Sequence, residues 1–467
     1  MRTIRLHKAA LVTMTLTTFW LGALPQVGAQ MEKPSTSPGS QLRRAGAFLG
    51  LKQAIEIAFK NHPAIQEADA TLKAAGARTE QTRSLYYPQV YANFDTIGGV
   101  GGINPRFVAP AGSMLRQNLS QYAGGVIANQ RLYDFGYTSN LVDASKYAER
   151  AQGEDVSARR ALVSLIVQRA YFNSLKRRRL VQIAEETVRE RGVIRSQIEA
   201  LYREKLKSKL DLNLVQVELT NAESALVKAG NDLKASFAAL NRAMGAVGPE
   251  EYVLEDLPIE VRGQRPLETL IAESLSHPEL KRAKEIVRSA ESRLSATKKL
   301  YLPTVSAIAS AGDYEVFDTD RKNVSTGGWW TAAGLVSVPL FTGFLIENQV
   351  REASAQKSAA MATSLSIEQA LTEQVTNAYL DTVTFAQQIK LAEEQVKTAK
   401  EALRLSRQRY ALGLGSIVEV TQSEVAVTAA QTKLADAQYD YKIAEVTLAY
   451  AAAGLVTQGG DAMETSQ

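Results

Sequence analysis

The sequence YYPQV at residues 86–90 returns as YLPTV at residues 301–305, an offset of 215 (301 − 86). Later matches share an offset of 208: Leu132 with Leu340, Asn140 with Asn348, Ala170 with Ala378 and Tyr202 with Tyr410. Two constant offsets indicate a tandem duplication in which one surface loop has changed length. The sequence therefore predicts two similar repeats, residues 51–248 and residues 267–455, joined by a linker at residues 249–266.

Each repeat begins with helical periodicity that a His-Pro pair interrupts, at residues 62–63 and at residues 277–278. Proline is favoured in the first turn of a helix, so a second helical segment is expected to begin at each pair. The two histidines are equivalent in the repeat and lie at helix breaks. This placement favours helix capping or packing over metal binding, and we predict no metal site.

Short strands are predicted after these helices. Pro88 and Pro303 end the helices, and apolar and polar residues alternate after each proline. The pattern predicts two hairpins with four strands: residues 88–98 with 121–132, and residues 303–313 with 329–340. Four strands cannot close a barrel, and unpaired strand edges in lipid are costly. Three copies supply twelve strands, an even number within the range of outer-membrane barrels.

Long helices follow the strands. No proline occurs from Gly136 to about Tyr202, and residues 345–412 contain neither proline nor glycine. Such a helix is about 100 Å long. Each long helix is followed by a short break in the helical pattern, at residues 205–208 or 413–416. A return helix is predicted after each break. The apolar positions of the return helices predict antiparallel coiled-coil seams: Leu210, Leu214, Val217 and Ala225 in the first repeat, and Val418, Val425, Ala429 and Leu434 in the second.

The N-terminus has the pattern of a secretory signal peptide at residues 1–29, with a basic start, an apolar stretch and small residues before the cleavage site. A membrane anchor is the alternative, but the apolar stretch is short for a span of about 20 residues. Flexible segments are expected at residues 30–50 and 456–467. The chain has no cysteine, which excludes disulfides, thiolate metal sites and cysteine nucleophiles.

The remaining charges are interspersed along the chain, so no nucleic-acid partner is predicted. The one compact basic cluster, KRRR at residues 176–179, favours a solvated helix face. The sequence contains no Ser/His/Asp set, phosphate loop or metal-spaced cluster. We therefore expect neither enzymatic activity nor a cofactor. The predicted fold class is mainly α with a β-barrel portion, in a tandem-duplicated protomer that oligomerises.

Four motifs together resemble the TolC family of outer-membrane efflux proteins: Asn-His-Pro at residues 61–63, the proline before each first strand, LYDFG at residues 132–136, and the pattern from Tyr410 to Val420. The resemblance covers about Leu51 to Leu455. It implies a homotrimer with a 12-stranded barrel in the lipid of the outer membrane and a periplasmic α-barrel.

For function, the resemblance implies a passive exit duct of a tripartite efflux pump or a type I secretion system. The implied partners are a periplasmic adaptor (membrane fusion) protein and an inner-membrane transporter. A structural or adhesive trimeric coiled-coil surface protein is the alternative, which would explain the heptads but not the duplicated hairpins. A soluble periplasmic adaptor would need a lipoyl-like or β-sandwich segment, and none is visible.

The resemblance also places the closing aperture of the duct just after the second turn. Glu419 stands there, Gln422 lies one turn on, and Asp211 is the equivalent of Glu419 in the first repeat. Three copies of Glu419 would focus a negative potential in a narrow throat. Both acidic residues also suit an ordinary helix start. Gln422 stands where the family often carries a second acidic residue, which argues against a double acidic ring.

Further candidates lie in the two turns and at the strand–helix junctions. The turn and gating candidates are Tyr410, Gly413, Gly415, Ser416, Lys205 and Ser208, and the junction candidates are Pro88, Pro303, Gly136 and Gly343. Tyr410 either links the helices that hold the tip shut or packs as a coiled-coil aromatic. Lys205 replaces the equivalent Gly413, which argues against two equally sharp turns. Lys205, Lys207 and Lys209 either contact an adaptor or face solvent.

Overall fold

The computed structural model describes residues 46–99, 119–248, 250–261, 263, 265–318 and 324–453. These residues belong to one compact unit that starts at Arg43. The predicted signal peptide at residues 1–29 and the predicted tail at residues 456–467 lie outside the described residues.

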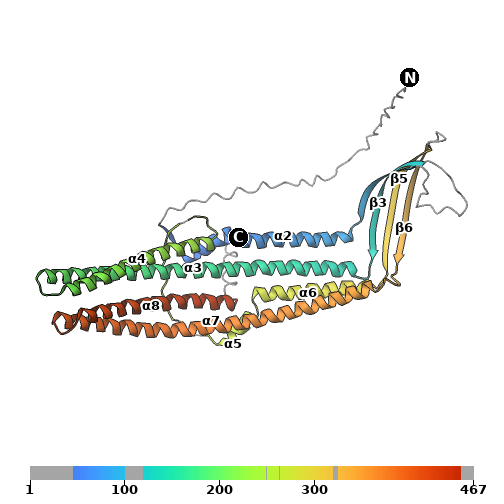
Figure 1. Ribbon diagram of the computed structural model, residues 1–467. Coiled ribbons are helices and arrows are strands. Elements are labelled where there is room, and N and C mark those ends of the chain that lie inside the picture. The colour runs from blue at the N-terminus through green and yellow to red at the C-terminus, as the bar shows by residue number, and fades with distance from the viewer. Residues whose placement is uncertain are drawn as a thin grey trace, which may run out of the picture. The chain divides into compact units, whose positions relative to one another are not determined.

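The two repeats contain the same series of α-helices, and the first has one short 3₁₀ helix in addition (Figure 1). The first has α1 (Leu51–Asn61), α2 (Pro63–Arg83), the short 3₁₀ helix η1 (Ser84–Tyr86), α3 (Tyr137–Arg203) and α4 (Lys209–Ala243), and the second has α5 (Leu267–Ser274), α6 (Pro278–Lys299), α7 (Leu345–Ala411) and α8 (Ile417–Ala451). Both α3 and α7 have 67 residues, or about 100 Å of helix. Both α4 and α8 have 35 residues. None of the helices in the described ranges is long and apolar enough to cross a membrane.

The His-Pro pairs separate two helices in each repeat, as predicted. His62 Nδ1 accepts a hydrogen bond from the Ala64 amide at 3.2 Å, and His277 Nδ1 accepts one from the Glu279 amide at 3.3 Å. Each imidazole therefore caps the helix that its proline begins. The predicted capping role is confirmed for both histidines.

The four predicted strands form one antiparallel sheet in the order β2-β3-β5-β6. Their bounds are Gln89–Gly99 for β2, Leu119–Tyr133 for β3, Thr304–Asp318 for β5 and Val324–Ser337 for β6. Gln89 pairs with Asn129, and Thr304 pairs with Ser337. Adding the two offsets to the first pair gives the second (89 + 215 = 304; 129 + 208 = 337). The two hairpins therefore have identical register, which confirms the duplication at the level of single residue pairs.

The second hairpin differs from its predicted bounds of residues 303–313 and 329–340. Asp313 and Gly328, at the predicted boundary of the strands, pair with each other inside the ladder, and the strands continue beyond them. The second strand also ends at Ser337 rather than at residue 340. Pro339 has no amide hydrogen and cannot continue a ladder.

The expected flexible segment at residues 30–50 and the expected linker at residues 249–266 each contain a short strand. These are β1 (Ala47–Leu49) and β4 (Tyr252–Leu254), which pair in parallel. The hydroxyl of Tyr171 on α3 donates to both Leu49 O at 3.0 Å and Glu255 O at 2.9 Å. Expecting flexibility at residues 47–49 was therefore wrong. Strands of three residues are too short for alternation to reveal them.

The coiled-coil seams lie on different faces of α4 and α8 from those predicted. Most of the predicted seam residues are exposed, including Leu210, Val217, Val418 and Val425. The buried residues near the turns are instead Val215 on α4 and Ile417, Val420 and Val427 on α8. Each return helix carries two apolar stripes, and the heptad pattern does not show which stripe faces the same chain.

Candidate functional site at the helical tip

The turns between α3 and α4 and between α7 and α8 lie at the same end of the unit, opposite the strands (Figure 1). Both turns have the same hydrogen bonds. Lys205 N donates to Tyr202 O and Leu206 N to Leu201 O, just as Gly413 N donates to Tyr410 O and Leu414 N to Arg409 O. This pair of bonds is the Schellman motif that ends many helices.

The position that completes each motif is Lys205 in the first turn, with φ of 58°, and Gly413 in the second, with φ of 74°. The expectation that the lysine would make the turns differ in sharpness was wrong. The hydrogen bonds and the packing beneath the turn impose the left-handed conformation on the lysine as well.

A small apolar core lies beneath the turns and holds the two helical hairpins together. All four long helices contribute to it, with Ile198 from α3, Val215 from α4, Leu403 from α7 and Val420 from α8. Packing of this kind fixes the positions of both turns relative to each other.

The Asp211 carboxylate is occupied within its own turn. Its Oδ2 accepts a hydrogen bond from Ser208 N at 3.2 Å, and Ser208 Oγ accepts one from Asp211 N at 3.1 Å. The two residues form a complete capping box at the start of α4. The interpretation of Asp211 as a helix-start carboxylate therefore accounts for its contacts.

Glu419 is freer than its equivalent in the first repeat. Ser416 Oγ accepts a hydrogen bond from Glu419 N at 3.3 Å, but the carboxylate takes no part in a capping box. Its Oε2 lies 3.7 Å from Arg409 Nε, and its side chain is 48% exposed. Gln422, one turn further along α8, is also exposed. A Cβ at Gly415 would lie 3.1 Å from Glu419 Oε2, so this glycine leaves room for the carboxylate.

Tyr410 and Lys207 join the two turns directly. Lys207 Nζ lies 3.9 Å from the centroid of the Tyr410 ring, within the range of a cation–π contact. Burial raises the pKa of the Tyr410 phenol above its ordinary value of 10.0, and the positive charge of Lys207 opposes that rise. In this contact the Lys207 side chain is half-buried against the other hairpin, whereas the side chains of Lys205 and Lys209 are exposed.

A charged cluster, not predicted from the sequence, lies farther from the turns between α3 and the second hairpin. Arg407 Nη2 on α7 lies 3.2 Å from Glu190 Oε2 on α3 and 3.1 Å from Glu424 Oε1 on α8. The Glu424 side chain is buried. Burial raises its pKa above the ordinary value of 4.5, and the guanidinium of Arg407 opposes this rise. Its partners come from separate helices, so no spacing along the sequence could reveal it.

The basic cluster at residues 176–179 is another contact between elements. Lys176 Nζ lies 2.9 Å from Asp440 Oδ1 on α8, Arg177 pairs with Asp232 on α4, and Arg178 donates to Leu254 O on β4. Only Arg179 is exposed. The prediction of a solvated helix face was therefore wrong for three of the four residues.

The strand–helix junctions share one backbone shape. Pro88 and Pro303 directly precede β2 and β5. At the other end of each hairpin, two successive residues have positive φ: Phe135 with Gly136, and Gly343 with Phe344. The glycine and the phenylalanine have exchanged places between repeats. The sequence indicated only the glycines, because a left-handed phenylalanine leaves no local signal.

Within the described ranges, no three His, Asp or Glu side chains are grouped as a metal ion would require.

Comparison with known proteins gives the family. The model of the outer membrane efflux protein family matches residues 54–246 and 272–454. The chain is 24% identical over 395 residues to the solvent efflux pump outer membrane protein SrpC of Pseudomonas putida, covering 83% of each chain. It is 22% identical over 435 residues to outer membrane protein TolC of Escherichia coli (strain K12), covering 85% of this chain and 81% of TolC. The solved structure of VceC from Vibrio cholerae matches with a TM-score of 0.73 at 18% identity, covering 86% of this chain and 95% of VceC. The chain therefore belongs to the outer membrane efflux protein family.

Proposed function

We propose that three copies of this chain form one passive duct, with the strands in the outer membrane and the helices in the periplasm. The observation that carries this proposal is the four-stranded sheet, in which β2 and β6 are edge strands. In lipid, each unpaired backbone group costs several kcal/mol, so the edges have to pair between copies. Three copies give twelve strands, which suits a closed barrel.

The tip of the helices is the proposed docking surface for a periplasmic adaptor protein. Four leucines on or beside the turns are exposed: Leu206, Leu210, Leu412 and Leu414. An exposed apolar patch of this kind is typical of an interaction surface. The adaptor would connect the duct to an inner-membrane transporter that supplies the energy, so the chain itself needs no catalytic residues.

An efflux pump is favoured over a type I secretion system because the relative SrpC is named for solvent efflux. A strain that lacks this protein is expected to become sensitive to organic solvents and other small toxic compounds while its secreted proteins remain unchanged. Loss of a secreted protein with unchanged sensitivity would favour type I secretion instead.

The proposed aperture lies at the turn between α7 and α8, with Glu419 as its acidic ring. Glu419→Gln is expected to lower the cation preference of single channels in a planar bilayer, because it removes three negative charges from one throat. Asp211→Asn is the matched control, since that carboxylate serves its own helix start. An unchanged preference in Glu419→Gln would remove this residue from the aperture.

The duct itself is tested by membrane fractionation and a denaturing gel run with and without heating. The protein is expected in the outer membrane as a trimer that heating dissociates. A soluble monomer would refute the proposal.

A further inference from the structure

A groove with a volume of about 500 Å³ lies where α2, α3 and α6 meet. The middle helix is α3, which packs against α2 on one side and against α6 on the other (Figure 1). The lining residues come from residues 71–85, 141–152 and 289–293. Leu85, at one end of the groove, shortly precedes Gln89, the first residue of β2. The groove is therefore in the part of the helices that is nearest to the sheet.

The charged residues that line this groove are two arginines, and they are equivalent in the two repeats. Arg78 lies on α2 and Arg293 lies on α6, at the offset that relates these helices (293 − 78 = 215). Because α3 lies between α2 and α6, the duplication brings both positions into one groove, which we call the arginine groove. Both side chains are exposed, and neither forms an ion pair with a carboxylate of the described residues.

Other arginines on the same two helices have carboxylate partners. Arg83 Nη1 on α2 lies 2.7 Å from Glu80 Oε1, and Arg288 on α6 pairs with Glu285. Neither of these paired arginines lines the arginine groove. Unpaired like charges that share one cavity repel each other, and an anion bound between them removes this repulsion. The two unpaired arginines therefore favour a negatively charged ligand.

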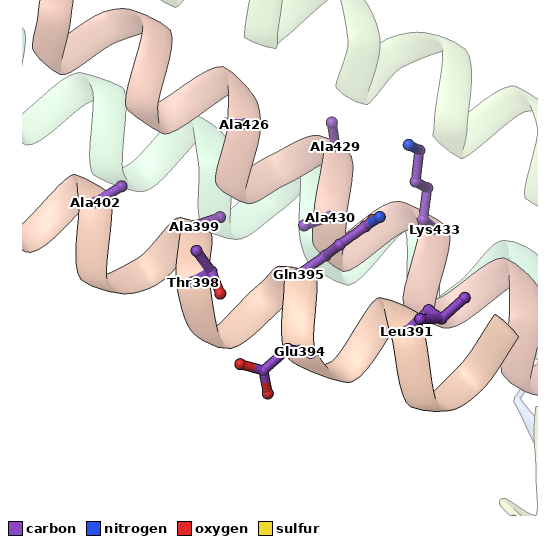
Figure 2. Close-up of a pocket in the computed structure, with 10 residues that line it drawn as sticks. All are labelled: Leu391, Glu394, Gln395, Thr398, Ala399, Ala402, Ala426, Ala429, Ala430 and Lys433. Atoms are coloured by element: carbon purple, nitrogen blue, oxygen red, sulfur yellow. The ribbon is translucent and has the colours of Figure 1, made fainter. Parts of the chain in front are cut away.

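The groove along the hairpin of α7 and α8 does not have this excess of positive charge (Figure 2). Its volume is about 630 Å³, and its lining includes one carboxylate, that of Glu394, and one ammonium group, that of Lys433. Figure 2 shows short alanine side chains along both of its helices. Of these two grooves, the smaller one is therefore the better candidate for binding an anion.

Hydrogen bonds between helices hold the walls of the arginine groove in place. Ser289 Oγ on α6 donates to Ala144 O on α3 at 2.7 Å. Thr82 Oγ1 on α2 lies 2.9 Å from Ser145 Oγ on α3. These bonds connect both outer helices to α3 and use hydroxyl groups of the wall, whereas the guanidinium groups remain available to a ligand. A cavity whose walls are already in place binds its ligand at a lower cost in entropy.

We propose that the arginine groove binds the phosphate head group of an anionic amphiphile. Guanidinium groups donate paired hydrogen bonds to phosphate oxygens. Leu85 and Leu141 line part of the remaining wall and would contact the apolar part of the ligand. The ligand is either an anionic phospholipid of the membrane or an amphiphilic phosphate in solution. All lining residues belong to one chain, so the site does not depend on the number of copies in the proposed duct.

Native mass spectrometry of the full-length protein in a neutral maltoside detergent tests both sources. One arm adds phosphatidylglycerol, and its control is diacylglycerol, which lacks the phosphate. The other arm adds octyl phosphate, and its control is octyl glucoside. We expect one anionic molecule to bind per chain, in preference to its uncharged control. Binding of phosphatidylglycerol would assign the groove to a lipid, and binding of octyl phosphate alone would assign it to a soluble anion.

Arg78→Gln with Arg293→Gln is expected to weaken binding of the anion by about tenfold or more, because each guanidinium supplies charged hydrogen bonds. Arg83→Gln with Arg288→Gln is the matched control. It removes the same charge from the same two helices outside the groove and is expected to leave binding unchanged.

A heat-dissociable trimer that binds neither anion would overturn this inference and leave the duct intact. Equal binding by the groove variant and the unaltered protein, or equal weakening in both double variants, would overturn it as well. A soluble protein that never forms trimers would instead refute the proposed function.

Discussion

At the scale of single residues, Lys205 has a backbone conformation that Gly413 adopts without strain. A left-handed L-residue costs roughly 1–2 kcal/mol, and glycine loses more entropy on folding than other residues. Lys205→Gly is therefore expected to stabilise the first turn by about 1 kcal/mol, or about fivefold in local opening. Hydrogen exchange of the Leu206 amide, which donates to Leu201 O, measures this change.

Glu204→Gly is the matched control for Lys205→Gly. Glu204 has φ of −81°, so a glycine there relieves no strain and is expected to speed exchange. If both variants slowed exchange equally, backbone strain at Lys205 would not be the cause.

His277, between α5 and α6, is expected to make the local stability of these two helices depend on pH. The side chain is fully buried, and burial lowers its pKa below the ordinary value of 6.5. The unfolded chain therefore binds a proton first as pH falls, so local stability is expected to decrease below about pH 6.5. At pH 5.5 the loss is at most about 1.4 kcal/mol.

Hydrogen exchange at Leu280 and Lys281, corrected for the intrinsic effect of pH, measures this loss. Asparagine also caps helices, so His277→Asn is expected to keep the cap and remove the pH dependence between pH 7.5 and 5.5. Equal dependence in both proteins would exclude His277 as its source.

At the scale of elements, the charged cluster between the hairpins has two unequal partners. Removing Arg407 leaves the buried Glu424 carboxylate without its nearest cation, whereas Glu424→Gln leaves Arg407 half-exposed and still beside Glu190. Arg407→Ala is expected to weaken the contact between α3 and the α7/α8 hairpin by about 2–3 kcal/mol at pH 7. Glu424→Gln is expected to cost less than about 1 kcal/mol.

Acid should partly rescue Arg407→Ala. The folded state holds the Glu424 proton to a higher pH than the unfolded state, so stability rises as pH falls toward 4.5. Hydrogen exchange of residues 183–191 and 424–431 measures the stability of this contact between α3 and the α7/α8 hairpin. The double variant Arg407→Ala, Glu424→Gln should recover most of the loss, and no recovery would indicate that Arg407 acts by packing alone.

At the same scale, sequence patterns predicted the local features of the fold correctly and missed several long-range contacts. Prolines and constant offsets predicted the helix breaks, the hairpins and the turns, because each depends on residues close together in the chain. The pairing of β1 with β4, the contacts of residues 176–179 and the faces of the coiled-coil seams were missed. Each joins residues far apart in sequence, and an apolar stripe alone does not identify its partner.

At the scale of the whole molecule, the contact between Lys207 and Tyr410 is expected to hold the closed tip of the proposed duct. A cation–π contact of this kind contributes about 1 kcal/mol. If the contact were lost in all three copies, the equilibrium constant between closed and open tips would shift by about two orders of magnitude. Lys207→Ala should therefore increase the open time of single channels in a planar bilayer.

Lys209→Ala removes an equally charged but exposed side chain two residues away and is the control for Lys207→Ala. It is expected to leave the open time unchanged. Similar effects of both variants would point to the net charge of the tip instead of the contact with Tyr410.

Each repeat contributes a hairpin, and a hairpin has two strands. Because two is even, the chain returns after each hairpin to the side from which it came. Both α3 and α7 therefore leave the sheet at the same end of its strands. A repeat with a single strand would have reversed the direction of its successor and placed the second pair of helices on the opposite side. The even number of strands in each repeat thus keeps the helices of both repeats at one end of the sheet.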